Sequence, residues 1–341
     1  MSQALRIHIA GAGALGLACA VRLAEAGAQV SVFDPSPPLA NASGVAAGML
    51  APAFETVLDD AARPHLALLT AAREVWPGFA QRHGLALDRR GAMAVGDGER
   101  LGRLEADFAA LGLAAERLGT AQAAALAPGL AAGFAGGIFT ADDWRIDAGP
   151  AIRALRAAAR DLGVAFRTEP LTGTGDADRV VVATGAANSL LGLAPEIGRL
   201  QPIKGHILRL AGAPYAGVVV RGPAAYAAPA EGGMTVGATM EAGVCDDAID
   251  PQRTAALRQA GEALFPGLAG ATAEARVGVR AATADGLPLV GPSGSGPILL
   301  AAGARRNGWL LAPLVAEVVT AYALDAEPGP WAARMAPSRF T

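Results

Sequence analysis

The sequence predicts an α/β protein in which a doubly wound domain is interleaved with an α+β domain containing a mainly antiparallel sheet. Three observations predict this fold class. Residues 5–34 have the pattern of a strand, a glycine-rich turn, a helix and a second strand, which together form a βαβ unit. Residues 179–185 have the pattern of a buried strand that ends in a tight turn. Residues 203–239 change to short β-like runs separated by glycine and proline, which is typical of antiparallel sheets.

The N-terminal βαβ unit is the clearest local pattern in the chain. Residues 5–10 predict a short buried strand. From Leu15 onward, apolar residues recur at three- and four-residue spacing until Gly27 ends the helix. Residues 29–33 then predict a second strand, which ends at Asp34.

The later elements follow from the same periodicities. Helical spacing predicts helices at 66–82, 151–162 and 309–324, and the Ala/Leu-rich stretch 101–126 predicts one more. Apolar runs between turn residues predict strands at 164–168, 206–210, 217–220, 234–238 and 298–302. We therefore expect two interleaved domains. The doubly wound domain takes residues 1–76, 140–198 and 281–341, and the second takes 77–139 and 199–280.

Composition excludes several classes of protein. The chain has 341 residues, of which 52% are hydrophobic and 17% charged, so it is not a disordered chain. At roughly 150 residues per domain, this length predicts two domains. A net charge of −3 without a run of Lys or Arg argues against a nucleic-acid partner. Cys19 and Cys245 lack redox-pair spacing, and the four scattered His residues predict no metal site.

Neither the N-terminal residues nor the two uncharged stretches predict export or a membrane span. Residues 1–6 run directly into a strand without the basic start and apolar stretch of a signal peptide. The uncharged stretches 118–141 and 286–304 are interrupted by glycine and proline. We therefore expect a cytoplasmic protein without an integral membrane segment.

A glycine motif follows the first strand directly. Gly11 permits a tight turn, Gly13 lets a pyrophosphate approach the backbone, and Gly16 allows the helix to pack on the strand. The N-terminus of that helix favours anionic phosphates. Asp34, at the end of the second strand, can accept hydrogen bonds from ribose hydroxyls. This Rossmann-like arrangement predicts dinucleotide binding, although the motif alone does not separate FAD from NAD.

Four further segments carry a resemblance to a known family. They are residues 43–52 of the small-residue run 41–52, the strand and turn 181–186, the segment 201–205 and the segment 305–313. Together they resemble the FAD-dependent glycine oxidase family of thiamine biosynthesis, within the D-amino acid oxidase superfamily. The resemblance implies FAD as the cofactor, and neither cysteine matches a flavin-bonding position, so we expect FAD to be bound non-covalently.

The resemblance also assigns residues to the two ligands. It implies that Arg280 clamps the substrate carboxylate, with a surface ion pair as the alternative for this residue. Arg306 lies between an apolar strand and an apolar helix, and the resemblance makes its anionic partner the substrate or the flavin edge. Tyr226 and Met240 match pocket walls, with core packing as the alternative. The residues that the resemblance places around FAD are Gly11, Gly13, Ala14, Leu15, Gly16, Asp34, Pro35, Ala42, Ser43, Ala47, Gly48, Met49, Leu171, Thr184, Gly185, Gly303, Ala304, Arg305, Arg306, Asn307, Gly308, Trp309 and Leu310.

The reaction that the resemblance implies is oxidative deamination of glycine or another small amino acid. Hydride passes from Cα to FAD, dioxygen reoxidises the flavin with release of hydrogen peroxide, and the imine hydrolyses to an oxoacid and ammonia or serves thiamine thiazole synthesis. Two alternatives remain open at this point. They are a D-amino acid dehydrogenase that passes electrons to a quinone or carrier, and a non-catalytic flavin-binding protein. A homo-oligomer is also left open.

Several positions depart from the family's pattern. Ala281 follows the clamping arginine where a proline is usual, and Ala230 replaces a basic residue. Ala304 and Arg305 replace a histidine and an aromatic residue, and the extra cation at Arg305 favours an acidic or otherwise altered substrate. His206 replaces Gln or Glu, and we expect it to be structural or at the surface.

One acidic pair is also expected to have no role in the site. Asp142 and Asp143 follow one another in a predicted turn. We therefore expect both to be solvated carboxylates.

Overall fold

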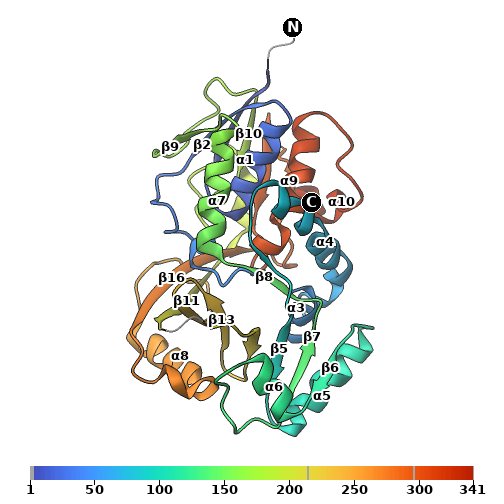
Figure 1. The fold of residues 1–341 in the computed structure, drawn as a ribbon. Coiled ribbons are helices and arrows are strands. Elements are labelled where there is room, and N and C mark those ends of the chain that lie inside the picture. The colour runs from blue at the N-terminus through green and yellow to red at the C-terminus, as the bar shows by residue number, and fades with distance from the viewer. Residues whose placement is uncertain (1–3, 213–214, 295, 341) are drawn as a thin grey trace.

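The computed structural model describes residues 4–212, 215–294 and 296–340. Figure 1 shows a part that contains both chain ends and a second part below it. A small sheet lies where the two meet, formed by β3 (Met49–Leu50), β8 (Trp144–Ile146) and β4 (Leu87–Asp88). No helix among the described residues is long and apolar enough to cross a membrane.

The upper part is built on the predicted doubly wound layer. Its six-stranded sheet has the order β17 (Leu289–Pro292), β18 (Ile298–Ala302), β10 (Arg179–Val182), β1 (Arg6–Ala10), β2 (Gln29–Phe33) and β9 (Ala165–Arg167). All neighbours are parallel except β17 and β18. Val180, Val181 and Val182 are fully buried, which explains why β10 is a continuous apolar run with helices or loops on both faces.

Helices cover the faces of this sheet. They are α1 (Ala14–Glu25), α4 (Leu66–Arg82), α7 (Ala148–Asp161), α9 (Gly308–Ala323) and the short α10 (Ala332–Met335). Helix α1 contacts both α7 and α9, and α4 packs on α9 (Figure 1). The indole Nε1 of Trp76 on α4 donates to the backbone carbonyl of Leu310 on α9 at 3.1 Å. Helix α4 continues through Pro77. The expected domain boundary at residue 76 thus lies inside a helix.

The lower part contains a nine-stranded sheet. Its order is β15 (Glu241–Ala242), β11 (Gln201–Ala211), β14 (Gly233–Gly237), β13 (Tyr226–Ala230), β12 (Val219–Arg221), β5 (Ala92–Val95), β7 (Gly137–Thr140) and β6 (Glu116–Leu118), with β16 (Ala273–Ala282) also paired to β11. Every pair is antiparallel except β12 with β5, so the predicted mainly antiparallel sheet is present. Helices α5 (Gly98–Ala110), α6 (Thr120–Leu126) and α8 (Pro251–Leu264) belong to this part (Figure 1).

Some elements differ from the sequence-based expectations. The region 101–126 contains β6 between its two helices, because Glu116–Leu118 pairs with β7. Strands β5, β7 and β16 are not predicted from the sequence. The short helices α2 (Ala42–Val45) and α3 (Pro52–Leu58) occupy the small-residue run and its end. Both segments reach the junction of the two parts, since α2 packs on β16 and α3 contacts α4 and α5.

Candidate active site

A long cleft of about 510 Å³ follows the carboxyl ends of the parallel strands. The turn after β1 begins it, and Gly11 there has φ of +106°. A Cβ on Gly11 would lie 2.3 Å from the carbonyl oxygen of Ala183, and a Cβ on Gly16 would lie 2.0 Å from the carbonyl oxygen of Gly11. Both close approaches require glycine. The N-cap residue of helix α1 is Gly13, which has no side chain to cover the first turn of the helix. The helix N-terminus is therefore open toward the cleft.

Polar side chains fix the shape of this turn. Asp34 Oδ2 accepts a hydrogen bond from the Ala12 amide at 2.7 Å, and its Oδ1 accepts one from Ser36 at 2.9 Å. Ser43 Oγ accepts from the Ala14 amide at 2.9 Å. Asp34 therefore lines the cleft and also holds the glycine turn in place. The cleft, the glycine turn and the acidic residue at the end of β2 together fit an extended dinucleotide.

The structure distributes the expected cofactor residues over three places. The cleft is lined by Gly11, Gly13, Ala14, Leu15, Asp34, Pro35, Ala42, Ser43, Leu171, Thr184, Gly185, Gly303, Ala304, Arg305, Arg306, Gly308 and Trp309. A second cavity is lined by Ala42, Ala47, Gly48, Met49, Arg306, Asn307 and Trp309. Gly16 and Leu310 line neither of these cavities, because Gly16 packs against the turn and the side chain of Leu310 on α9 is buried in the core.

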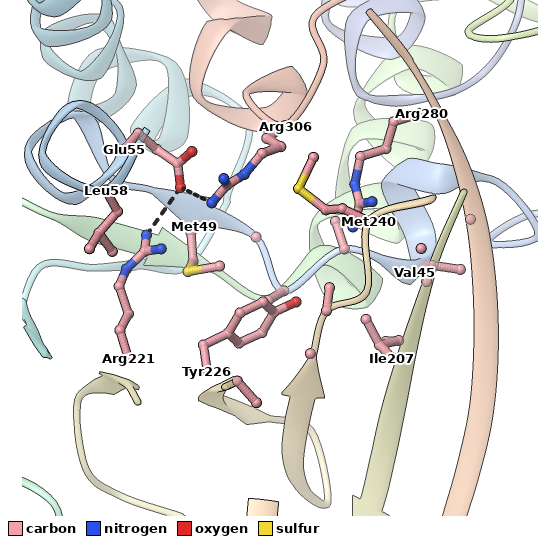
Figure 2. Close-up of a pocket in the computed structure, with 18 of the residues that line it drawn as sticks. Val45, Met49, Glu55, Leu58, Ile207, Arg221, Tyr226, Met240, Arg280 and Arg306 are labelled. Carbon is pink, nitrogen blue, oxygen red and sulfur yellow. Dashed lines mark hydrogen bonds and ion pairs between the residues drawn. The ribbon is translucent and has the colours of Figure 1, made fainter. Parts of the chain in front are cut away.

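The second cavity has a volume of about 360 Å³ and adjoins the cleft. The two share several lining residues, among them Gly278, Arg280, Arg306 and Trp309. All four expected substrate residues line the second cavity, namely Arg280, Arg306, Tyr226 and Met240 (Figure 2). The nine-stranded sheet supplies Tyr226 and Arg280, while the loop before α9 supplies Arg306.

Arg280 lies on β16 beside a strand that leaves room for its guanidinium. A Cβ on Gly205 of β11 would lie 2.3 Å from Arg280 Nη1. Among the described residues, Arg280 makes one hydrogen bond, from Nη1 to the carbonyl of Thr239 at 3.4 Å, and no ion pair. Burial lowers the pKa of Arg280. The structure therefore does not support the surface ion pair, and it leaves this guanidinium facing the cavity without a carboxylate.

Tyr226 points its hydroxyl toward the middle of the cavity (Figure 2). Burial raises the pKa of Tyr226, while the nearby Arg280, Arg221 and Arg306 lower it in part. The phenol therefore stays protonated near neutral pH and can donate a hydrogen bond. Met240 is 44% exposed and lines the cavity. Core packing does not account for Met240 at this exposure.

Arg306 is held by carboxylates of the chain itself. Its Nη2 lies 3.2 Å from Glu55 Oε1, and its Nη1 lies 3.4 Å from Asp59 Oδ2. Glu55 is the main cause of the raised pKa of Arg306. Arg306 therefore has two anionic partners within the chain, and its expected contact with the substrate or the flavin edge stays a prediction. Arg305 also pairs with Asp59, which neutralises the extra cation on which the expectation of an acidic substrate was based.

Two charged residues of the site were missed at the level of sequence. Glu55 and Arg221 are both 5% exposed, and Glu55 Oε1 lies 3.3 Å from Arg221 Nη2 (Figure 2). Each follows an apolar run, Ala53–Phe54 or Val219–Val220. A charged residue directly after a buried run is the signal that would have indicated them, because buried charges need partners.

Asp143 explains how helix α3 presents Glu55. Asp143 is buried, and its carboxylate accepts hydrogen bonds from the amides of Ala53 at 2.8 Å and Phe54 at 3.0 Å. Burial raises the pKa of Asp143 to about 6, partly offset by Arg221 and these amides. The expectation of a solvated carboxylate is therefore wrong for Asp143, because β8 places it against the start of α3.

His206 has a structural role, as expected. It is fully buried, its Nδ1 lies 3.0 Å from Glu241 Oε1, and its Nε2 accepts a hydrogen bond from the Asp250 amide at 3.0 Å. Thr239 Oγ1 also lies 3.2 Å from Nδ1. This network fixes Thr239, whose carbonyl accepts from Arg280.

Comparison with known proteins identifies the family. The FAD dependent oxidoreductase family matches residues 6–322 of this chain. The chain belongs to this family. FAD is accordingly its cofactor, which confirms the choice between the two dinucleotides that the glycine motif left open.

Individual relatives agree with this assignment. A Rhizobium etli protein named as a thiamine biosynthesis oxidoreductase, ThiO, is 32% identical, and the match covers 92% of this chain and 94% of that protein. A glycine oxidase of Bacillus licheniformis is 27% identical over 91% of this chain and 90% of its own length. The bifunctional ThiO/ThiG protein of Trichormus variabilis is 30% identical over 98% of this chain, which spans only 55% of that longer protein.

A solved structure gives the same answer for the fold. The crystal structure of glycine oxidase from Geobacillus kaustophilus superposes with a TM-score of 0.86 at 25% identity, covering 98% of this chain and 99% of that one. The predicted fold class and the resemblance to glycine oxidases are confirmed. This chain is an FAD-dependent amino acid oxidoreductase of the glycine oxidase and ThiO type.

Proposed function

We propose that this flavoprotein oxidises the Cα–N bond of a small amino acid whose carboxylate binds Arg280. The observation that carries the proposal is the unpaired guanidinium of Arg280 in a cavity that shares its wall with the dinucleotide cleft. A substrate carboxylate is the natural partner for such a cation, because a two-pronged hydrogen bond would compensate its burial. Tyr226 supports the proposal, since its protonated hydroxyl points into the same space.

The residues of the cleft support binding of FAD in an extended form. The first turn of α1, after Gly11 and Gly13, would hold the pyrophosphate, and Asp34 would accept hydrogen bonds from the ribose. Arg306 and Trp309 would lie around the ring system, because both line the cleft and the adjoining second cavity. When bound, FAD supplies a two-electron acceptor for the hydride from Cα.

The chain's residues orient the substrate and do not act as a strong base. Among the described residues, no histidine or lysine lines the second cavity, and its one carboxylate, Glu55, is tied to Arg221 and Arg306. Arg280 would fix the carboxylate, and Tyr226 would donate to it. Together they would hold Cα at the wall that the second cavity shares with the dinucleotide cleft. This positioning removes translational and rotational freedom of the substrate before the reaction.

Dioxygen as the electron acceptor and the role in thiazole supply also belong to this proposal. Oxidation of the amino acid gives an imine, and the two electrons reduce dioxygen to hydrogen peroxide. Water then hydrolyses the imine to an oxoacid and ammonia. The relatives named glycine oxidase and ThiO support this choice, and a carrier-dependent dehydrogenase is the alternative that the test separates.

Anaerobic mixing with glycine, sarcosine and both enantiomers of alanine and aspartate tests the proposed function. We expect at least one amino acid to bleach the flavin absorbance, and admission of air to restore it with one equivalent of hydrogen peroxide. Flavin that no amino acid bleaches would refute the proposal. Flavin that is bleached but reoxidised only by a quinone would leave the amino acid chemistry intact and refute dioxygen as the acceptor.

A further inference from the structure

The second cavity has a cationic end that the proposed function does not use. Arg221 and Arg100 line it, together with Leu58 and the turn at Gly222–Pro223. In Figure 2, Arg221 and Arg280 lie on opposite sides of the cavity, with Met49 and Tyr226 between them.

The charges of the lining do not balance. Among the described residues, the second cavity is lined by four arginines, Arg100, Arg221, Arg280 and Arg306, and by one carboxylate, Glu55. Glu55 is shared between Arg221 and Arg306 through a single oxygen, Oε1. Arg306 also pairs with Asp59. With a substrate carboxylate on Arg280, the opposite end keeps Arg221 and Arg100, and Arg221 pairs with the shared Glu55.

Arg221 and Arg100 are poorly compensated there. Arg221 is 5% exposed, and its Nε is buried without a hydrogen-bond partner among the described residues. Arg100 donates only to backbone carbonyls, those of Val95 at 3.2 Å and Gly222 at 3.4 Å. Burial and, to a smaller extent, Arg103 lower the pKa of Arg100, and the nearby Asp97 raises it in part. Both residues line the cavity, so a ligand carboxylate there would supply a further acceptor for their guanidinium groups.

We propose that the substrate is an amino acid with a second acidic group, bound between Arg280 and Arg221. This inference rests on the proposed function and names its substrate class, an amine dicarboxylate such as aspartate. The α-carboxylate binds Arg280, and the second carboxylate binds Arg221, with Arg100 adding to the attraction. Tyr226 and Met49 form the wall along which the chain between the two groups lies.

The free oxygen of Glu55 defines the competing possibility. Its Oε2 is buried without a hydrogen-bond partner among the described residues, so a cationic side chain would find an acceptor there. The surrounding arginines outnumber this single carboxylate, which favours the acidic substrate. Ornithine and lysine are therefore included in the test.

The test compares aspartate with asparagine, because the pair differs in charge and hardly in shape. We expect kcat/KM for the preferred enantiomer of aspartate to exceed that for the same enantiomer of asparagine at least tenfold. A ratio of 1 or less, or a preference for ornithine or lysine, would overturn the inference. If glycine or alanine still bleached the flavin in that case, the proposed function would stand alone. If no amino acid bleached it, both would fail.

Variants locate the effect. Arg221→Gln should bring the aspartate-to-asparagine ratio toward 1, and Arg100→Gln should lower it several-fold. Arg103→Gln, on the exposed face of α5, removes the same charge and should leave the ratio unchanged. A ratio that persists in Arg221→Gln would contradict the assignment of the second carboxylate.

A binding measurement covers the case in which Arg221→Gln fails to fold. Calorimetric titration of the FAD-bound wild type should give at least tenfold tighter binding of succinate than of butyrate. Equal affinities would overturn the inference without any variant.

Discussion

Glu55 and Arg306 form an ion pair, with 3.2 Å between Oε1 and Nη2, that joins helix α3 to the loop before α9. The two residues are 251 positions apart in the sequence. Glu55 also binds Arg221 of the large sheet, so one carboxylate connects three separate segments around the second cavity. The position of this carboxylate determines both the stability and the charge of the candidate site.

Glu55→Gln should therefore destabilise the protein. The change leaves Arg221 and Arg306 without a full negative charge, and removing one partner of a buried pair costs about 3 kcal/mol. Urea unfolding of the FAD-bound protein measures this change in the free energy of unfolding. Glu99→Gln is the control, because its pair with Arg103 is exposed and should contribute less than about 1 kcal/mol. Equal losses in the two variants would contradict the central position of Glu55.

Arg280→Ala should weaken substrate binding without loss of FAD. A two-pronged, charge-assisted contact contributes about 3 to 4 kcal/mol, so kcat/KM should fall roughly 100- to 1,000-fold, mostly through KM. Steady-state kinetics and the ratio of flavin to protein absorbance measure the two effects. Arg276→Ala on the same strand is the matched control, because Arg276 pairs with the exposed Glu274. Unchanged kinetics in Arg280→Ala would remove this residue from the site.

Tyr226→Phe should lower kcat/KM by a smaller factor. The variant keeps the ring that lines the cavity and removes only the protonated hydroxyl. Loss of one hydrogen bond to a charged group costs about 1.5 to 3 kcal/mol, or roughly 10- to 150-fold. The same kinetic assay measures it, and wild-type values would indicate that the hydroxyl does not reach the substrate.

Asp143 should make stability depend on pH between about 4 and 7. Burial raises its pKa from 3.8 to about 6, so the folded protein holds this proton more tightly than the unfolded chain does. The stabilisation is complete below pH 3.8 and is lost as the pH rises through about 6. The Asp143→Asn variant has no carboxyl group to titrate at this position, so it does not lose this stabilisation. The free energy of unfolding of the variant, minus that of the wild type, should rise by about 2 to 3 kcal/mol from pH 4 to pH 7.

Denaturant unfolding at several pH values measures this difference, and groups shared by the two proteins cancel. A difference that stays constant with pH would show that Asp143 is ionised in the folded protein throughout this range.

FAD should be released by acid precipitation. Cys19 is buried, and burial raises its pKa to about 12, so it is not reactive. Cys245 is exposed and lines the dinucleotide cleft, which makes it the cysteine to test. We expect the yellow colour in the supernatant. Non-covalent binding would be contradicted if the colour stayed in the pellet of the wild type but passed into the supernatant in the Cys245→Ser variant.

Local patterns were sufficient to predict the doubly wound layer. Strand β2 and strand β18 have the predicted limits, because turns and apolar runs bound both. The glycine turn and Asp34 were predictable for the same reason, since they are close in the sequence. Arg280, Tyr226, Met240 and Arg306 came from the resemblance, and the structure brings all four to one cavity.

The remainder of the site depends on pairings between distant segments. The place of Arg221 in the site depends on the parallel pairing of β12 with β5, which lies more than a hundred residues away. The local pattern of apolar residues does not predict that pairing. Glu55 owes its position to Asp143, which directly precedes β8 of the small sheet. The neutralisation of Arg305 likewise required Asp59 to lie nearby in space.

The most direct test of the account is a crystal structure of the FAD-bound protein with an unreactive carboxylate such as glycolate. We predict that the Arg280 guanidinium donates two hydrogen bonds to that carboxylate, with the ligand between Tyr226 and the isoalloxazine ring. A structure in which Arg280 points into solvent, or in which the carboxylate binds elsewhere while FAD occupies the cleft, would contradict it.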